Sequence, residues 1–302
     1  MRIAVTGATG FCGRYLVRQL VEQGHQCRCW YRPTSDRSGL SGVATHVEWC
    51  QGELGDPGAC AALVDGCDAV VHAGLHRQDA AFRGGEGDPV AFVEKNVVGS
   101  LQLIEASRRA DVSRFVFVST CAVHERILDD RTLDEAHPLW PTSLYGAYKA
   151  AVEKFVHGFG FGDGFPICSI RPTGIYGVAR PVAGSKWFSL VRSVVKNAAV
   201  HCDRGGKEVH VADVARAIDL LLTARGVAGE SFNCYDRYVS QFEVAMLARE
   251  MSGSSSVITG GQTAPKHQIS VEKIKRLGMR FGGADLLRQT IADMVQHLRS
   301  LE

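Results

Sequence analysis

The sequence lacks the features that mark membrane, nucleic-acid-binding and metal-binding proteins. Its 302 residues contain no apolar run that approaches the roughly 18 residues a membrane helix needs. Lysine and arginine form no dense run and the net charge is +2, so nothing indicates a nucleic-acid partner. No two of the 10 cysteines form a C-x-x-C pair, which argues against a zinc site or a redox dithiol. We therefore expect reduced thiols in a cytoplasmic protein.

Internal repeats and low-complexity segments are also missing. Because the first expected strand begins at Arg2, we expect no signal or transit peptide. The composition is that of an ordinary globular protein, 45% hydrophobic and 22% charged. A chain of this length holds either one large domain or a domain with a smaller lobe.

A glycine-rich turn near the start organises the rest of the chain. Residues 3–5 form a short apolar run, Thr6–Gly13 contains three glycines spaced G-x-x-G-x-x-G, and an amphipathic stretch follows. Gly7 permits a sharp turn, Gly10 lets the backbone approach phosphate oxygens, and Gly13 lets a helix pack against the strand. A glycine triplet alone also fits an ordinary loop, but its position between strand and helix predicts a pyrophosphate site.

Apolar runs then alternate with helical patterns. After the first strand, which begins at Arg2, the second to fifth expected strands are residues 26–31, 43–50, 68–73 and 114–119. One expected helix follows the glycine turn, another opens at Pro57, and a third spans 90–109. The last of these strands is apolar throughout, as a central parallel strand should be. The alternation predicts an α/β fold with a doubly wound parallel sheet.

The segment after the fourth strand has two possible roles. The small residues Ala73 and Gly74 would let a cofactor approach closely, whereas His72 and His76 flank a strand end, so we expect no metal there. Residues 75–89 are polar and carry three glycines. They are either a lid over the cleft or a simple loop.

The end of the second expected strand bears on the choice of cofactor. An acidic residue there would hold the ribose 2′-hydroxyl of NAD, and a basic one would accept the 2′-phosphate of NADP. The strand ends in Arg32, with Arg37 close behind and no acid before Asp36. The alternative is a solvated arginine, but the charge favours NADP(H) over NAD(H).

Candidate reacting groups follow the fifth strand. Ser119, Thr120 and Cys121 stand where such sheets bind ligands. Tyr145 and Lys149 are four residues apart, so on a helix they share a face. A neighbouring ammonium and a positively charged nicotinamide would lower the pKa of a phenol, and the Thr120 hydroxyl could bind the substrate oxygen. Without the glycine turn, Tyr145 and Lys149 would be interpreted as a chance match or as an ordinary exposed pair on a helix.

These motifs resemble those of the extended short-chain dehydrogenase/reductases, the group of NAD(P)-dependent epimerases, dehydratases and carbonyl reductases. Thr6–Gly13 resembles the family's T-G-x-x-G-F-x-G turn, and Tyr145 with Lys149 its Tyr-x-x-x-Lys. The family's catalytic hydroxyl matches Thr120, with Ser119 as the second choice. The resemblance implies a Rossmann fold and an NAD(P)-dependent enzyme.

The likeness continues almost to the C-terminus. Asn96 fits an Asn-Val-x-Gly-Thr segment, although Ser100 replaces the threonine. Residues 171–177 resemble the R-P-x-x-x-Y-G turn that contacts nicotinamide, and residues 210–215 resemble an H-V-x-D-V-A motif. The cofactor-binding residues expected from the motifs and the resemblance are Gly7, Thr9, Gly10, Phe11, Gly13, Arg32, Arg37, Glu53, Leu54, Ala73, Gly74, Asn96, Ser119, Tyr145, Lys149, Pro172 and Thr173.

Departures from the family pattern bear on the substrate. Cys121 and Ala122 stand where 4,6-dehydratases carry an Asp-Glu pair. Near the positions where epimerases carry a diphosphate-binding Arg and an Asn, this chain has Lys207 and Thr173. His124 replaces a sugar-binding Tyr. The departures favour an oxidoreductase of a small carbonyl or hydroxyl compound over a nucleotide-sugar epimerase, and the intact Tyr-x-x-x-Lys disfavours a non-catalytic NADP sensor.

The C-terminal part is expected to build most of a substrate lobe. We place the cofactor domain at residues 1–171, with later segments adding to its sheet, and the lobe mainly at 172–302. We expect His124, Tyr176 and Trp187 to contact the substrate, although a histidine at such a position is more often structural. Residues 181–187 are expected to roof the pocket, with Phe188 as a further wall. A homodimer is possible by analogy with relatives.

Two apolar stripes at helical spacing mark core helices of this part. Their members are Val214, Ala217, Ile218, Leu221 and Leu222 in the first, and Leu287, Ile291, Met294, Val295 and Leu298 in the second.

Overall fold

The computed structural model describes residues 1–78 and 84–301, and these form two compact units. The first unit contains residues 1–172, 214–234 and 269–279; the second contains 173–213, 235–268 and 280–302. The first unit thus takes in two later segments. Residues 79–83 of the 75–89 segment lie outside the described residues, so the choice between lid and loop stays open.

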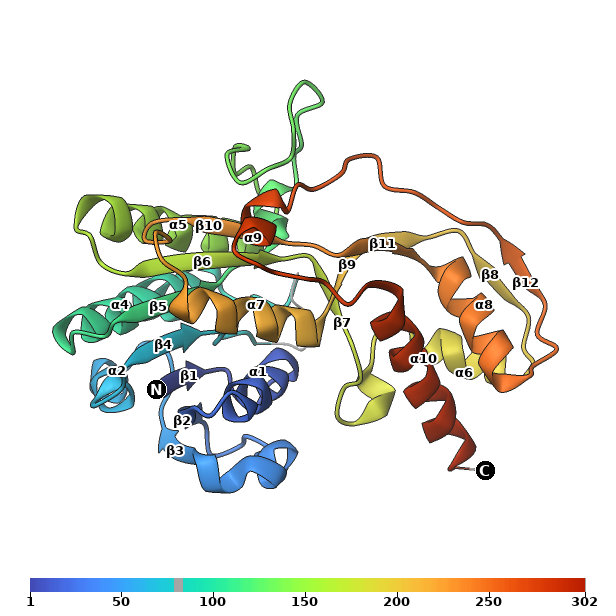
Figure 1. Cartoon of the computed structure of the whole chain (residues 1–302), viewed down its shortest axis with the longest axis horizontal. Helices are drawn as coiled ribbons and strands as arrows, with labels where there is room; N and C mark the ends of the chain where they lie inside the picture. The colour runs from blue at the N-terminus through green and yellow to red at the C-terminus, as the bar shows by residue number, and fades with distance from the viewer. Residues whose placement is uncertain (79–83, 302) are drawn as a thin grey trace. The chain divides into compact units, whose positions relative to one another are not determined.

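A seven-stranded sheet forms the centre of the first unit (Figure 1). Its strands are β1 (Arg2–Thr6), β2 (Gln26–Tyr31), β3 (Val47–Gln51), β4 (Ala69–His72), β5 (Arg114–Val118), β6 (Ile167–Pro172) and β10 (Ser231–Cys234). The order is β10-β6-β5-β4-β1-β2-β3 and every neighbouring pair is parallel. The predicted doubly wound parallel sheet is confirmed.

Helices flank this sheet. They are α1 (Phe11–Glu22), η1 (Ser38–His46), α2 (Pro57–Val64), α3 (Pro89–Val93), η2 (Glu94–Val98), α4 (Gly99–Arg109), η3 (Cys121–His124), α5 (Leu144–His157), η4 (Gly158–Gly162), α7 (Val211–Thr223, which begins in the second unit) and α9 (Glu272–Arg276). Asp56 caps α2 and Ser143 caps α5 with side-chain oxygens, the N-cap chemistry that starts a helix. The core beneath α2, α4 and α5 contains Val70, Phe115, Phe117, Leu103, Ile104 and Val152.

Two elements differ from the prediction. Residues 43–46 belong to the 3₁₀ helix η1, and only Val47–Gln51 form a strand. The reason is that β2 begins at Gln26 and its Cys27 pairs with Val47, which leaves no ladder for the preceding residues. The predicted 90–109 helix is confirmed, but a π-helical turn, η2, interrupts it at Glu94–Val98. Such turns are frequent at functional sites.

The second unit has its own core of three helices and small sheets. Its elements are β7 (Gly174–Tyr176), η5 (Val182–Gly184), α6 (Phe188–Val195), β8 (Val200–Cys202), β9 (Gly205–His210), β11 (Arg237–Ser240), α8 (Gln241–Ser252), β12 (Ile258–Gly260) and α10 (Gly283–Arg299). The apolar stripe of α10 is buried against α6 and α8, together with Phe188. The stripe of α7 is buried in the first unit. Both predicted stripes are therefore core residues.

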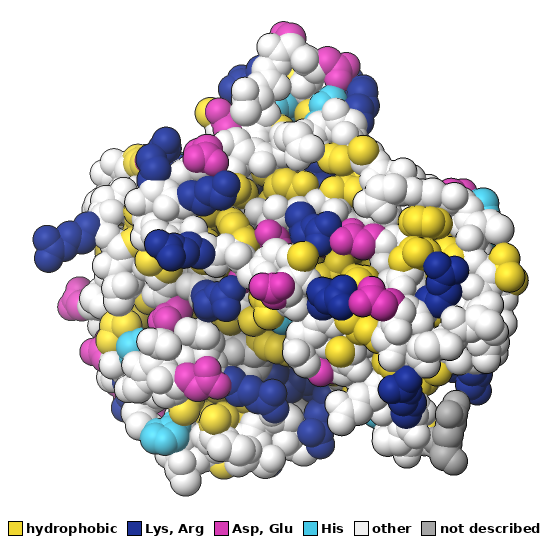
Figure 2. Space-filling model, turned by 45° about the vertical axis from the view of Figure 1, so that its right-hand side comes forward, with side chains coloured by type: hydrophobic (Ala, Val, Ile, Leu, Met, Phe, Trp, Pro, Cys, Tyr) yellow, Lys and Arg dark blue, Asp and Glu magenta, His cyan; other side chains and the backbone are white. Residues whose placement is uncertain are grey.

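The surface carries charges of both signs. On the face shown in Figure 2, Lys and Arg side chains lie among Asp and Glu side chains rather than in one basic patch. Among residues 1–78 and 84–301, none of the helices combines the length and apolar character that crossing a bilayer requires.

Candidate functional site

The turn between β1 and α1 is built by glycines at positions where side chains would clash. Gly7 has φ +72°, and a Cβ there would lie 2.6 Å from the carbonyl oxygen of Ala73. A Cβ on Gly13 would lie 2.0 Å from the carbonyl oxygen of Gly7. The close packing of strand, turn and helix therefore requires glycine at both positions.

The first turn of α1 is suited to an anion. No side chain caps the helix at Gly10, and its first turn holds no acidic residue. Free backbone N–H groups and the positive end of the helix dipole therefore remain available to a phosphate. Thr9 lies in the turn itself, and Phe11 opens the helix with its ring 5.8 Å from that of Tyr15. The observed geometry fits a dinucleotide pyrophosphate.

A buried hydrogen-bond chain joins this turn to the end of β4. The Thr6 hydroxyl accepts a bond from the Gly74 backbone N–H (2.9 Å) and contacts His72 Nδ1 (2.7 Å). His72 Nε2 contacts the Ser100 hydroxyl at 2.8 Å, and burial lowers the pKa of His72 to about 3. Both ring nitrogens are therefore occupied within the protein. No cluster of three or more metal-ligating side chains occurs in the described part of the chain.

Asn96 lies in the π-helical turn η2 and is fully buried. Its amide accepts a hydrogen bond from the His76 N–H (2.8 Å) and donates to the carbonyls of His76 and Phe92 (2.9 Å each). Asn96 thus fixes the chain that follows β4. Of the other predicted cofactor contacts, Leu54 is buried and Glu53 is exposed. The Glu53 Oε1 lies 3.3 Å from the Lys95 Nζ.

The two arginines after β2 are held differently. The exposed Arg32 side chain makes no hydrogen bond or ion pair with another described residue. Arg37 lies over the ring of Tyr31, with its guanidinium carbon 4.5 Å from the centroid, and also faces Trp49. The Asp36 carboxylate accepts hydrogen bonds from the backbone and hydroxyl of Ser38 (2.9 and 2.6 Å), so it is engaged in its own turn.

Tyr145 and Lys149 share one face of α5, as their spacing predicts. The Lys149 Nζ is buried and lies 6.0 Å from the centroid of the Tyr145 ring. It donates a hydrogen bond to the carbonyl of Val118 at the end of β5 (2.6 Å). Burial lowers the pKa of Lys149 to about 7, although the charge of Glu153 opposes the shift.

The two candidate hydroxyls after β5 have different environments. The Ser119 hydroxyl is buried and donates to the carboxylate of Glu153. Thr120 is half-buried, and its oxygen accepts a hydrogen bond from the Ala122 N–H at the start of η3 (3.1 Å). The hydroxyl proton of Thr120 is not required for that contact, which favours Thr120 over Ser119 as a donor to a substrate.

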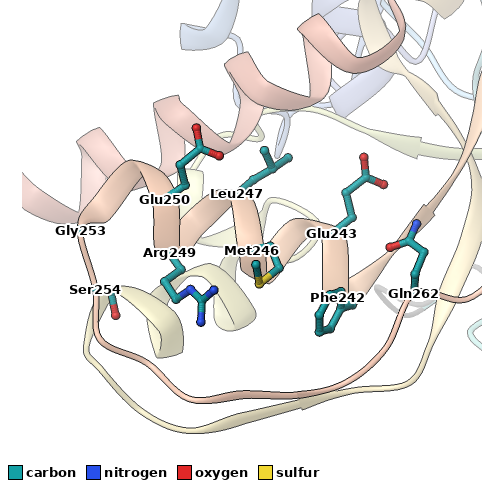
Figure 3. Close-up of a pocket in the computed structure, with 9 residues that line it drawn as sticks. All are labelled: Phe242, Glu243, Met246, Leu247, Arg249, Glu250, Gly253, Ser254 and Gln262. Atoms are coloured by element: carbon teal, nitrogen blue, oxygen red, sulfur yellow. The ribbon is translucent and has the colours of Figure 1, made fainter.

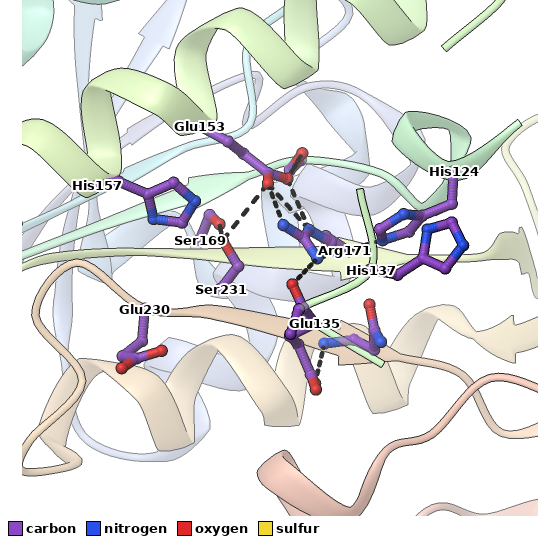
Figure 4. A network of polar contacts seen from close by, with 12 residues as sticks. His124, Glu135, His137, Glu153, His157, Ser169, Arg171, Glu230 and Ser231 are labelled. Carbon is purple, nitrogen blue, oxygen red and sulfur yellow. Dashed lines mark hydrogen bonds and ion pairs between the residues drawn. The ribbon is translucent and has the colours of Figure 1, made fainter. Parts of the chain in front are cut away.

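Sequence reasoning missed a buried ion pair behind these residues (Figure 4). Glu153 of α5 and Arg171 of β6 are 0% and 1% exposed, and Arg171 Nη2 lies 2.6 Å from the Glu153 carboxylate. His124 belongs to this network: its Nε2 lies 3.2 Å from Arg171 Nη1 and its Nδ1 lies 3.3 Å from the carbonyl of Pro138. A buried position with both ring nitrogens in contact favours the structural role for His124. The sequence signal for the pair was Arg171, the one charged residue in the segment Ile167–Pro172.

The remaining predicted residues lie at the end of β6 and in the second unit. Pro172 ends β6, and Thr173 follows it with a buried hydroxyl that has no hydrogen-bond partner among the described residues. The Tyr176 hydroxyl is likewise buried without such a partner. Its ring lies 5.3 Å from that of Trp187 and 5.1 Å from that of His210. Phe188, the second expected wall, is buried in the core of this unit.

The second unit also has an open hollow of about 790 Å³ beside α8 (Figure 3). It is lined by Phe242, Glu243, Met246, Leu247, Arg249, Glu250, Gly253, Ser254 and Gln262. None of the predicted site residues lines it.

The model of the NAD dependent epimerase/dehydratase family matches residues 3–234, which include the glycine turn, Tyr145, Lys149 and Arg171. The chain belongs to this family. The resemblance to extended short-chain dehydrogenase/reductases is thereby confirmed. Membership explains why the glycine turn, the Tyr-x-x-x-Lys pair and the parallel sheet occur together.

Individual relatives of this epimerase/dehydratase family member carry out several reactions. A 3 beta-hydroxysteroid dehydrogenase/Delta 5→4-isomerase of Mycobacterium tuberculosis is 32% identical over 63% of this chain and 51% of its own length. The chain thus spans about half the length of that relative. A 4-hydroxy-2-methyl-3-oxo-4-farnesyl-3,4-dihydroquinoline-1-oxide ketoreductase of Stigmatella aurantiaca is 30% identical over 77% of this chain and 67% of its own.

Solved structures show the same architecture. A dTDP-glucose 4,6-dehydratase of Streptomyces venezuelae, crystallised with NAD bound, aligns with a TM-score of 0.79 and 25% identity. The alignment covers 100% of this chain and 98% of that one.

Proposed function

We propose that this protein is an NADP(H)-dependent oxidoreductase that transfers hydride between the nicotinamide and a small carbonyl or hydroxyl compound. The observation that carries the proposal is the arrangement on α5, where the buried Lys149 ammonium lies 6.0 Å from the Tyr145 ring and is anchored to the end of β5. The names of the steroid dehydrogenase and ketoreductase relatives support the same reaction type. In this proposal the first unit binds the cofactor and the second unit contributes to the substrate site.

The chain's own groups would handle the proton. The nicotinamide supplies or accepts the hydride when the cofactor is bound. Tyr145 gives its phenolic proton to the substrate oxygen during reduction, or takes it during oxidation. Lys149 stabilises negative charge on the phenol oxygen, and Thr120 donates a hydrogen bond to the same substrate oxygen.

The preference for NADP(H) rests on the loop after β2. The Arg32 guanidinium is exposed and makes no hydrogen bond or ion pair with the described residues, so its donors are available to a 2′-phosphate. Asp36, the first acid after β2 in the sequence, accepts hydrogen bonds from Ser38. A dianionic phosphate beside Arg32 is therefore favoured over a hydroxyl that needs a carboxylate acceptor.

The environment of Thr120 supports redox chemistry over dehydration. Cys121 and Ala122 follow it in η3, and the first acid after them is Glu125. The Glu125 carboxylate accepts hydrogen bonds from Thr142 and Ser143 at the start of α5. An acid engaged in this way is poorly placed to act as the acid or base of a water elimination.

A nucleotide-sugar epimerase is the second candidate, because the family includes epimerases. Titration of the purified protein with NADPH and NADH, followed by a panel of aldehydes, ketones, alcohols and UDP-sugars, separates the two. An oxidoreductase consumes cofactor in proportion to product. An epimerase retains tightly bound NAD, interconverts a UDP-sugar and shows no net cofactor turnover. Cofactor binding with no turnover of any member of the panel would favour the non-catalytic sensor.

We expect Tyr145→Phe to lower kcat by about 10³-fold, because it removes only the hydroxyl that moves the proton. The ring remains to pack, so the NADPH dissociation constant should stay within about threefold of that of the parent protein. Steady-state kinetics and fluorescence titration measure the two quantities. Normal turnover in this variant would refute the assignment of Tyr145.

A further inference from the structure

Helix α5 holds the carboxyl end of β5 at two successive residues. Lys149 Nζ donates to the carbonyl of Val118 (2.6 Å), and the carboxylate of Glu153 accepts the proton of the Ser119 hydroxyl. Lys149 and Glu153 are four residues apart, so they project from one face of the helix. The residue that follows this clamped pair is Thr120.

Glu153 is itself held by a buried cation. Arg171 Nε lies 3.0 and 2.9 Å from the two carboxylate oxygens, and Nη2 lies 2.6 Å from one of them (Figure 4). Removing two charges from water is costly, so apolar side chains would often give an equally stable core. Burial of this pair therefore calls for a role other than stability alone.

The far side of the pair is closed by a neutral histidine. Burial, together with the charge of Arg171, lowers the pKa of His124 to about 4, so the ring is uncharged near neutral pH. An Nδ1–H that donates to Pro138 leaves Nε2 to accept from Arg171 Nη1, which also donates to the carbonyl of Glu135 (3.2 Å). The guanidinium is thereby fixed in position, and Glu153 with it.

The charge of Lys149 depends on its surroundings. Desolvation disfavours the ammonium, and the largest opposing influence is the carboxylate of Glu153. The ionisable groups facing Lys149 are Tyr145, Tyr148 and Glu153 of its own helix, Cys12 of α1 and His72 of β4. Glu153 is the one acidic side chain in this set.

We propose that Glu153 is a positioning residue for the reacting groups: through Lys149 and Ser119 it keeps the ammonium charged and fixes the strand end that presents Thr120. The inference rests on the proposed function for its catalytic meaning. The effect of Glu153 on the charge of Lys149 can be measured without any turnover of substrate.

The test compares Glu153→Gln, which keeps the shape and removes the charge, with the parent protein. The titration of Lys149 is followed by NMR of protein labelled with ¹³C at the lysine ε-carbon, with Lys149→Arg used to assign the resonance. We expect the midpoint of Lys149 to fall by about one pH unit. The alkaline limb of kcat/KM should move to lower pH by the same amount, while NADPH affinity stays within about threefold.

Two further variants make the result specific. Arg171→Gln removes the cation beside Glu153, so the Lys149 midpoint should move upward, opposite to Glu153→Gln, in the pH range where the Glu153 carboxylate stays ionised. If one of Glu153→Gln and Arg171→Gln fails to fold, the Lys149 midpoint in the other still tests the proposal. Ser231→Ala alters an uncharged neighbour of Glu153 at 3.4 Å and should leave the midpoint unchanged.

An unchanged Lys149 midpoint in Glu153→Gln, or equal shifts in Glu153→Gln and Ser231→Ala, would overturn the proposal. A parent protein that turns over no substrate but shows the expected shifts would instead count against the proposed function, because the NMR titration needs no reaction.

Discussion

The glycine turn and the inner face of α5 are both parts of the candidate site, but they are built in opposite ways. The turn is defined by missing side chains, since a Cβ at Gly13 would lie 2.0 Å from a backbone oxygen. The face of α5 is defined by charged side chains that the protein has removed from water, Lys149 and Glu153. The first region is therefore sensitive to added volume, and the second to changes of charge or hydrogen bonding.

The largest effect is expected from adding a single carbon to the turn. Gly13→Ala forces its Cβ against the backbone of Gly7 and Ala8, which cannot move without separating β1 from α1. We expect a loss of about 3 kcal/mol in the free energy of unfolding and loss of NADPH binding. Urea denaturation and cofactor titration measure both.

Gly42→Ala is the matched control, because a Cβ at Gly42 meets nothing within 4 Å and its φ is not positive. Its unfolding free energy should change by less than about 1 kcal/mol. Equal losses in the two variants would mean that the clash at Gly13 does not define the turn.

The next effect separates the two hydroxyls that follow β5, of which the α5 face holds that of Ser119. Thr120→Ala should lower kcat by about 10²-fold with little change in stability, since it removes a donor to the substrate. Ser119→Ala should instead cost about 1–2 kcal/mol of unfolding free energy, because it takes a donor from buried Glu153, and lower kcat by less than about tenfold. If kcat fell further in Ser119→Ala than in Thr120→Ala, the two roles would be reversed.

The smallest effect is expected at the exposed edge of the cofactor site, where water competes for every contact. Arg32→Ala should weaken NADPH binding by about tenfold and NADH binding by less than about twofold, because one charge-assisted contact to the 2′-phosphate is lost. Arg109→Ala, an exposed arginine near Glu105, serves as the control and should change neither. Equal weakening of NADPH and NADH by Arg32→Ala would show that Arg32 does not contact the 2′-phosphate.

The same contrast explains how much could be predicted from the sequence. Glycine spacing and apolar periodicity are local signals, so the turn, the 26–31 strand, the parallel sheet and the shared face of Tyr145 and Lys149 were all predictable. Where local signals compete with pairing partners, the prediction was wrong. Residues 43–46 include the β-branched Val43 and Thr45, which suit a strand, but they have no ladder on β2.

The parts of the site that could not be predicted depend on distant residues. Nothing local indicates that Glu153 meets Arg171, 18 residues later, or that His124 contacts Arg171. The environment of Asn96 is equally hidden, since two of the three hydrogen bonds of its side chain join it to His76, 20 residues earlier. The expected homodimer and cytoplasmic location stay predictions.

The order in which the strands of the large sheet are synthesised has a consequence for how the chain folds. Strand β10 pairs with β6 but lies about sixty residues further along, beyond the first segment of the second unit. While the ribosome makes the residues between them, β6 has one unpaired edge, which is a site for wrong pairing. A protein fragment that ends at Pro172 would keep the β6 edge permanently exposed. We therefore expect such a fragment to aggregate. Adding a separate peptide of residues 214–234, which contains β10, should restore the complete sheet.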